Sequence, residues 1–393
     1  MRIFQSIFFL LFLAPLLAQQ PITPQQDGNG KFFFQIGNVY FQVNAKHGAR
    51  IDSFSLDGQQ FLSLDTHVAD MYGSTAWLSP QSLWGWPPQP QIDGNAYTGG
   101  IIGNRVVLTS AQASADKTTL KFIMRKTFSA DLKDSSVTIS YSIINKSNIA
   151  RSFAVWEIMR VPAGGLSFFP VNGSITGDLK NFFSTLNGVA WWDYTSSETY
   201  SNKAFADGKG GWLAHIDDNR IITIKKFTDT QSNFPSNTEK EIEFYADPSR
   251  YYTEIEKHTD YKSIAVGDSS TLTMTWYLRK LPDSIEVTEG NPEILNYIDG
   301  ILNPKNTGID PNPNSVLSYS VFPNPSQGEI EIYSSKPVKE VSLILLNVLG
   351  KVVLSQTVTT GQKIQLMNFS DGIYFYKIGN SDDFTSGKLL LKK

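Results

Sequence analysis

Apolar and polar residues alternate with a period of two through most of the chain, the pattern of β-strands with one buried face. The alternation is clearest over 120–124, 137–144, 241–245 and 272–278. A helical period appears only weakly, over 294–301. Many short antiparallel strands spread over roughly 250 residues are typical of one large sandwich. We therefore predict an all-β protein.

Changes in this pattern predict where the parts of the chain begin and end. The first residues carry Arg2, a short apolar run and then Ala18, as a secretory signal peptide does, and the run is too short to span a bilayer. Prolines and asparagines interrupt the strands once more before the C-terminus. The expected parts are a signal peptide (1–18), a flexible lead-in (19–30), a large β domain (31–282), a linker (283–315) and a second β domain (316–393).

Composition removes several classes of function. A net charge of −3 without a basic cluster argues against a nucleic-acid partner. The absence of cysteine excludes disulfides, thiolate metal sites and thiol nucleophiles. No segment after the signal peptide is long and apolar enough for a transmembrane helix. No nucleotide, phosphate or zinc motif occurs, so no cofactor or metal is indicated, and calcium binding stays open.

Four motifs in the second β domain occur in a set order. They are 321–332 (VFPNPSQGEIEI), 341–353 (VSLILLNVLGKVV), 366–378 and 387–393. Together they resemble the C-terminal sorting domain of the type IX (Por) secretion system, an immunoglobulin-like sandwich. The resemblance implies that residues 316–393 are recognised by the type IX machinery and that the protein is secreted or displayed on the outer cell surface. A small adhesive module is the alternative.

The large domain also carries a resemblance. A strand pair over 48–62 turns at Asp57-Gly58, a loop follows at 79–88 (SPQSLWGWPP), and later strands cover 254–276. These segments resemble the galactose-mutarotase-like superfamily, whose β-supersandwich binds sugars in a cleft. The resemblance implies a carbohydrate or glycan partner and a glutamate base on the last strands.

One departure from that family concerns its catalytic histidine. The family carries a histidine acid at a position that Trp156 or Glu157 occupies here. None of the four histidines falls there: His47, His67, His215 and His258. The sequence therefore argues against ordinary aldose 1-epimerase activity, because positioned acid–base groups are each worth roughly a hundredfold or more.

Three glutamates are the candidate catalytic residues. Strand alternation puts Glu254 and Glu256 on one face, where they act as base and neighbouring acid or orienting group unless that face is solvated. The family position favours Glu254. Glu157 lies on an apolar strand, where an unpaired carboxylate is costly. It is either a residue of the cleft or one half of a structural buried ion pair, with Arg151 or Arg160 as the possible partner.

The proline-rich loop supplies the candidate sugar-binding residues. Its prolines hold two indoles in place, and rigid aromatic rings pack on the apolar faces of sugars. The alternative is a loop that plugs the end of the sandwich. The predicted substrate-binding residues are Trp84, Trp86, Gln81, Asp93, Tyr97, Trp156 and Arg160.

Three functions remain open from the sequence. The protein could be a carbohydrate-active enzyme that isomerises or cleaves a glycan, a noncatalytic glycan binder, or a structural or adhesive surface protein. Sugar recognition is favoured, and turnover is left undecided because fold analogy supplies no mechanism.

Overall fold

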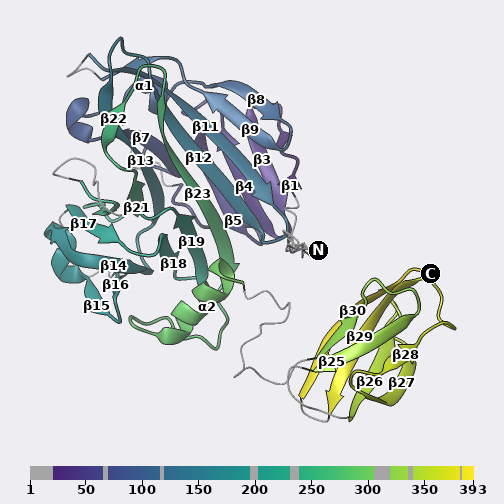
Figure 1. The fold of residues 1–393 in the computed structure, drawn as a ribbon. Helices are drawn as coiled ribbons and strands as arrows, with labels where there is room; N and C mark the ends of the chain where they lie inside the picture. The colour runs from purple at the N-terminus through teal and green to yellow at the C-terminus, as the bar shows by residue number, and fades with distance from the viewer. Residues whose placement is uncertain are drawn as a thin grey trace, which may run out of the picture. The chain divides into compact units, whose positions relative to one another are not determined.

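A computed structural model describes residues 21–64, 70–115, 119–194, 202–230, 239–304, 319–334, 340–380 and 383–393. The expected signal peptide lies outside these residues. The chain forms two compact units, Met1–Leu302 and Asn303–Lys393. Nearly all regular structure in both is β-strand, which confirms the all-β prediction (Figure 1).

One layer of the large unit contains the strands that later form the site. Its strands pair in an antiparallel order that ends with β7, β13, β21, β20 and β17. The strands are β2 (Gln25–Gln26), β3 (Lys31–Ile36), β4 (Val39–Asn44), β5 (Arg50–Leu56), β6 (Gln59–Gln60), β7 (Ser74–Ser79), β13 (Arg151–Pro162), β21 (Tyr252–His258), β20 (Ile242–Ala246) and β17 (Asn202–Gly208), with β22 (Lys262–Ile264) also paired to β13.

The other layer is built around three long strands, β11, β12 and β23, which run side by side (Figure 1). β14 pairs with β18 near its start and with β17 further along, so it connects the two layers. The strands are β8 (Thr98–Ile102), β9 (Arg105–Thr109), β10 (Ala113–Ser114), β11 (Lys121–Asp131), β12 (Ser136–Asn145), β23 (Ser269–Lys280), β19 (Ile221–Phe227), β18 (Trp212–Ile216), β14 (Leu166–Gly177), β16 (Val189–Asp193) and β15 (Ser184–Leu186).

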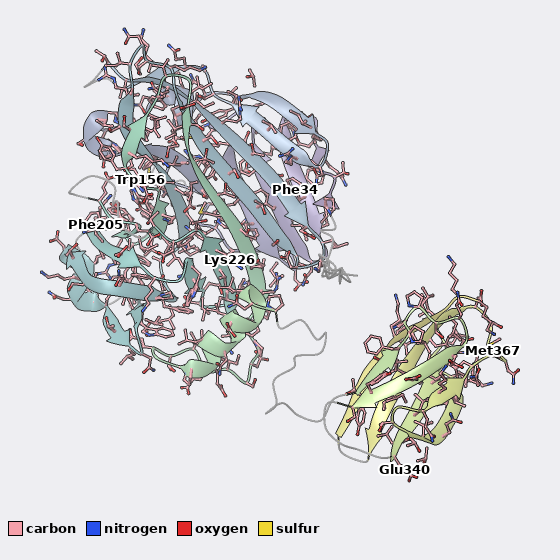
Figure 2. All side chains as sticks on the ribbon, viewed as in Figure 1. Phe34, Trp156, Phe205, Lys226, Glu340 and Met367 are labelled. Carbon is pink, nitrogen blue, oxygen red and sulfur yellow. The ribbon has the colours of Figure 1, made fainter. Side chains whose placement is uncertain are left out.

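Aromatic side chains fill the space between the layers. Phe41 and Phe54 from one layer meet Phe128 and Trp276 from the other, with ring centroids 5.7–6.5 Å apart. The labelled Phe34 belongs to the same core (Figure 2). Each such side chain withdraws a large apolar surface from water, so this core stabilises the sandwich.

Two expected irregular segments are structured. Within the lead-in, β1 (Pro21–Ile22) pairs with β11, and β2 pairs with β3, so a fully flexible lead-in is wrong for these residues. Within the expected linker, helix α2 (Pro292–Leu302) buries Ile294, Ile298 and Leu302 against the large unit. These three buried residues form one apolar stripe along α2, which explains the weak helical period in the sequence over 294–301. The large unit therefore ends at Leu302 rather than at residue 282.

The C-terminal unit is a small two-sheet sandwich. β24 (Tyr319–Phe322), β25 (Glu329–Ser334) and β28 (Lys363–Gln365) form one sheet. The second sheet contains β27 (Val352–Thr359), β26 (Glu340–Leu346), β29 (Gly372–Asn380) and β30 (Asp383–Leu391). A hairpin turn at Gly350 joins β26 to β27, and Gly350 has the positive φ of 75° that glycine adopts easily.

A buried ion pair links the two layers of the large unit. Glu157 on β13 accepts a hydrogen bond from Lys225 on β19, and both side chains are fully buried. Lys225 also donates to the carbonyl of Ile255, 2.8 Å away. Burial raises the pKa of Glu157 and lowers that of Lys225, while each partner favours the other's charged form. The expected pairing of Glu157 with Arg151 or Arg160 is therefore wrong.

We predict that Lys225→Met destabilises the protein by about 3–5 kcal/mol, because it leaves the Glu157 carboxylate buried without its cation. The double variant Glu157→Leu, Lys225→Met should recover most of this loss. Lys31→Met, which removes the partly exposed pair with Asp52, should cost about 1 kcal/mol or less. Chemical denaturation of the full chain measures all three, and equal losses for the two lysine variants would contradict the account.

Candidate functional site

Cross-strand pairing brings distant parts of the chain onto one face of the site layer. One row of opposing residues runs Lys203, Tyr245, Glu254 and Arg160 from β17 to β13. A parallel row contains Phe205, Glu243 and Glu256, and a third contains His258, Trp156 and Trp77. Because side chains on facing positions of paired strands lie on the same side of a sheet, these residues share one surface.

The opposite face of the same strands belongs to the interior. Glu157 alternates with Trp156 along β13, so it points away from the pocket toward Lys225. It cannot contact a ligand that binds beside Trp156. Glu157 is therefore a structural residue, and its predicted catalytic role is not supported by its position.

A pocket of about 370 Å³ opens on the shared face, next to the 3-10 turn Gln81–Leu83 that follows β7. Four predicted site residues line it: Gln81, Trp86, Trp156 and Glu254. The sequence did not single out the remaining lining residues, which are Met71, Trp77, Lys203, Tyr245, Asp247 and Tyr252.

Hydrogen bonds from behind the pocket hold its indoles in place. The Trp77 N–H donates to Asp93 Oδ1 at 2.9 Å, and the Trp156 N–H donates to Glu256. Trp77 meets Trp156 edge-on with centroids 5.1 Å apart. The rings therefore keep a fixed orientation whether or not a ligand is present.

Trp86 is the outermost ring of this group. Its ring is 58% exposed and meets Trp77 edge-on at 5.7 Å. Trp84 from the same loop is only 5% exposed, and its N–H donates to the Leu78 carbonyl at 2.8 Å. Of the two loop tryptophans predicted to bind sugar, one faces the pocket and the other packs behind it.

Two more predicted binding residues lie in the interior. Asp93 pairs with Arg50 at 2.9 Å, and Arg50, with Trp77, outweighs the effect of burial and holds the Asp93 pKa below its usual range. The Tyr97 hydroxyl donates to the Ile92 carbonyl at 2.8 Å. Neither lines the pocket. Asp93 instead positions Trp77, a role that residue spacing along the chain does not reveal.

Glu254 places a carboxylate on the pocket wall. Its Oε1 lies 2.7 Å from the Arg160 guanidinium, which is itself fully buried. Arg160 also lies over the rings of Trp77 and Tyr252, at 5.4 and 5.7 Å. Arg160 thus holds Glu254 in place from behind and does not line the pocket itself.

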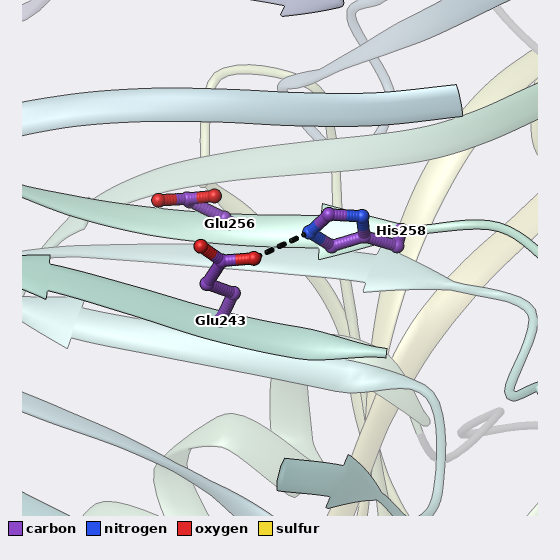
Figure 3. Close-up of side chains that lie close together, drawn as sticks. All are labelled: Glu243, Glu256 and His258. Atoms are coloured by element: carbon purple, nitrogen blue, oxygen red, sulfur yellow. Dashed lines mark hydrogen bonds and ion pairs between the residues drawn. The ribbon is translucent and has the colours of Figure 1, made fainter. Parts of the chain in front are cut away.

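Beneath Trp156, three titratable side chains form a buried cluster of Glu243, Glu256 and His258 (Figure 3). His258 Nε2 lies 3.0 Å from Glu243 Oε2, and the His258 ring stacks on Trp156 with centroids 5.3 Å apart. Lys203 donates to the other Glu243 oxygen. The sequence singled out Glu256 but not Glu243, because Glu256 and His258 lie on β21 whereas Glu243 comes from the neighbouring strand β20.

The protonation of the two cluster carboxylates differs. Burial and the nearby Glu243 raise the pKa of Glu256 well above its ordinary value. Burial also acts on Glu243, but His258 and Lys203 outweigh it and hold the Glu243 pKa below its usual range. The arrangement therefore keeps Glu243 charged and Glu256 protonated, because two adjacent buried carboxylates cannot both ionise cheaply.

These three residues could also hold a cation, since their ligand atoms lie within 4.8 Å of one another. A cation would have to compete with Lys203 for Glu243 and with the Trp156 N–H for Glu256. Because Lys203 and Trp156 already donate to these carboxylates, the cluster fits a hydrogen-bonded network better than a metal site.

Comparison with known proteins identifies the end of the chain. Residues 320–392 match the family described as the secretion system C-terminal sorting domain. The prediction of a sorting domain is confirmed. It indicates export by the type IX system to the cell surface or beyond. No curated protein matches the chain.

The neighbours of the large unit among solved structures are galactose-mutarotase-like proteins. A galactose mutarotase-like protein from Clostridium acetobutylicum has 9% identity and a TM-score of 0.47, covering 66% of this chain and 99% of its own. A putative aldose 1-epimerase from Escherichia coli K12 has 12% identity and a TM-score of 0.45, covering 64% of this chain and 100% of its own.

Within the described residues, no helix is both long and apolar enough to cross a membrane.

The buried acid Glu256 predicts a pH dependence of stability. Because its pKa is raised in the folded protein, the folded state binds a proton that the unfolded state has lost. This contribution to the free energy of unfolding is fully present below the ordinary glutamate pKa. It is lost as pH rises through the raised pKa that Glu256 has in the folded protein. The free energy of unfolding of the wild type, relative to Glu256→Gln, should fall by up to about 1.4 kcal/mol per pH unit in that range.

Chemical denaturation of both proteins at a series of pH values above 4.5 checks this. The neighbours facing Glu256, namely Glu243, Glu254, Lys203 and Trp156, are common to both proteins. The exposed Glu293→Gln serves as the matched control and should give a profile parallel to the wild type. Parallel profiles for the wild type and Glu256→Gln would contradict a protonated Glu256.

Proposed function

We propose that the large unit binds a carbohydrate in the pocket beside Trp86 and that the exported protein recognises glycans outside the cell. The observation that supports this most is the exposed Trp86 ring at a pocket whose wall also contains Trp77 and Trp156. Pockets lined by aromatic side chains with a few well-placed polar groups are typical binding sites for small ligands. The sequence resemblance to a sugar-binding superfamily points to the same class of ligand.

The chemistry of the pocket suits a sugar better than a purely apolar ligand. Sugar rings have apolar C–H faces that pack on aromatic rings and hydroxyls that need hydrogen bonds. The pocket offers three indoles together with the polar side chains of Gln81, Lys203, Asp247 and Glu254. An entirely hydrophobic ligand would leave these polar groups without partners, which costs free energy.

Several polar groups in the pocket are ready to bind hydroxyls. Glu254 uses Oε1 for Arg160, which leaves Oε2 as an acceptor. Asp247 accepts a backbone hydrogen bond at Oδ2 from Tyr251, and each carboxylate oxygen carries more than one lone pair that can accept. The side-chain amide of Gln81 can both donate and accept. Carboxylates and amides placed among rigid aromatic rings fix the orientation of a ligand.

A catalytic role is a second candidate, supported by the position of Glu254. Its carboxylate lies in the pocket on the strand where the family resemblance implies a base, and its Oε1 lies 2.7 Å from the buried Arg160 guanidinium. A base of this kind could take a proton from a sugar hydroxyl. Glu256 is a positioning residue for Trp156 in this proposal, because it does not line the pocket.

We predict that Trp86→Ala lowers glycan affinity about tenfold or more, since a stacked indole contributes roughly 1–2 kcal/mol. Binding of the full-length protein would be surveyed on a glycan array and quantified by isothermal titration calorimetry. The matched control is Ile102→Ala, which removes an equally exposed apolar side chain (62%) on β8. Unchanged affinity for Trp86→Ala, or equal losses for both variants, would contradict the proposed pocket.

The variant Glu254→Gln separates binding from turnover. If Glu254 is the base, the amide should lower the turnover of the bound glycan about a hundredfold or more while affinity changes only a few-fold. Chromatography and NMR of the glycan after incubation measure turnover. Absence of product with the wild-type protein would leave a noncatalytic binder, and absence of any bound glycan would favour the adhesive alternative.

A further inference from the structure

A second pocket adjoins the first on the same face of the site layer. It has a volume of about 410 Å³ and is lined by Ser82, Gly85, Phe205, Glu239 and Glu243, together with Gln81, Trp86 and Lys203. The last three residues also line the first pocket. The two pockets therefore meet at a shared boundary that consists of an exposed indole, an amide and an ammonium group.

The strand register sets the direction in which the two pockets follow each other. Lys203 pairs with Tyr245 in the first pocket, and Phe205 pairs with Glu243 in the second. These pairs are two residues apart along β17 and β20, a spacing of roughly 7 Å. Phe205 and Trp156 both lie in the large unit, on β17 and β13 (Figure 2). The second pocket thus continues the first along the strands.

The floor and the rim of the second pocket are fixed by hydrogen bonds. Glu239 accepts from the Ser79 hydroxyl and from the Gln81 backbone N–H, the latter at 2.9 Å. Glu243 accepts from Lys203 and interacts with His258. The base of the loop that carries Trp86 is therefore bonded to the segment that leads into β20.

Charge limits which glycans fit. Four carboxylates line the two pockets, from Glu239, Glu243, Asp247 and Glu254, and Lys203 is the cation among the lining residues. Arg160 behind the wall compensates Glu254. The excess of negative charge would repel uronate or sulfate groups in a partly desolvated site. Neutral hydroxyls, by contrast, can donate to the carboxylate oxygens.

We infer that the site takes a neutral oligosaccharide of at least two sugar units, with one unit in each pocket and Trp86 in contact with both. This inference rests on the proposed carbohydrate function and specifies its ligand. The two pockets share Gln81, Trp86 and Lys203, and each has further lining residues that the other lacks. A chain of linked sugars fills both pockets and keeps the shared Trp86 covered.

The experiment uses the full-length protein and neutral oligosaccharide ladders of one to six units, in gluco, xylo, manno and galacto series. Isothermal titration calorimetry should show affinity rising about tenfold or more from the monosaccharide to the longer members of one ladder. Oligogalacturonates of the same lengths should bind at least about tenfold more weakly.

Two variants test the second pocket itself. Phe205→Ala removes its apolar wall and should lower the ratio of hexasaccharide to monosaccharide affinity about tenfold. Ser82→Arg places a bulky side chain in the same pocket at an exposed position and should lower that ratio similarly without disturbing the core. Ile102→Ala should leave the ratio unchanged.

The possible outcomes separate this inference from the proposed function. Equal affinity for monosaccharide and hexasaccharide, or variants that leave the ratio intact, would overturn the second pocket while sugar binding stands. Tighter binding of oligogalacturonates would overturn the neutral class. If no ladder bound at all, the proposed function would fail and this inference with it.

Discussion

The pairing register of β17, β20, β21, β13 and β7 is the constraint on which the candidate site depends. Side chains alternate between the two faces of a strand, so a shift of one residue in any pair would exchange the pocket-facing and core-facing sets. With the observed register, Glu254 and Trp156 face the pocket while Glu157 faces Lys225 in the interior. The ion pair between Glu157 and Lys225 disfavours a slipped register. A slip of β13 by one residue would turn Glu157 to the pocket face and leave Lys225 buried without its carboxylate.

Buried carboxylates act mainly as supports for the aromatic wall. Asp93 holds the Trp77 indole and Glu256 holds that of Trp156, while Arg160 keeps Glu254 at the pocket surface. Each of these acids has a donor that offsets the cost of burial. A wall oriented in this way loses little conformational freedom when a ligand binds, which favours affinity for a weakly apolar molecule such as a sugar.

Much of the fold could be predicted from the sequence, but only part of the site. The period of two identified the strands, and the ordered C-terminal motifs identified the sorting domain. Helix α2 gave only a weak period because three buried residues attach it to the sandwich. Among the site residues, Gln81, Trp86, Trp156 and Glu254 could be predicted, because loop composition, strand alternation and the family resemblance mark them along the chain. Lys203, Asp247 and the roles of Asp93 and Glu157 depend on which strands pair, and no local pattern encodes that pairing.

A crystal structure of the full-length protein soaked with the longest neutral oligosaccharide that binds would locate the sugar site. We expect a sugar ring packed on the Trp86 indole, with a hydroxyl within hydrogen-bonding distance of Glu254, and a second ring beside Phe205. Sugar density on another face of the sandwich, with the pocket beside Trp86 empty, would show that the site lies elsewhere.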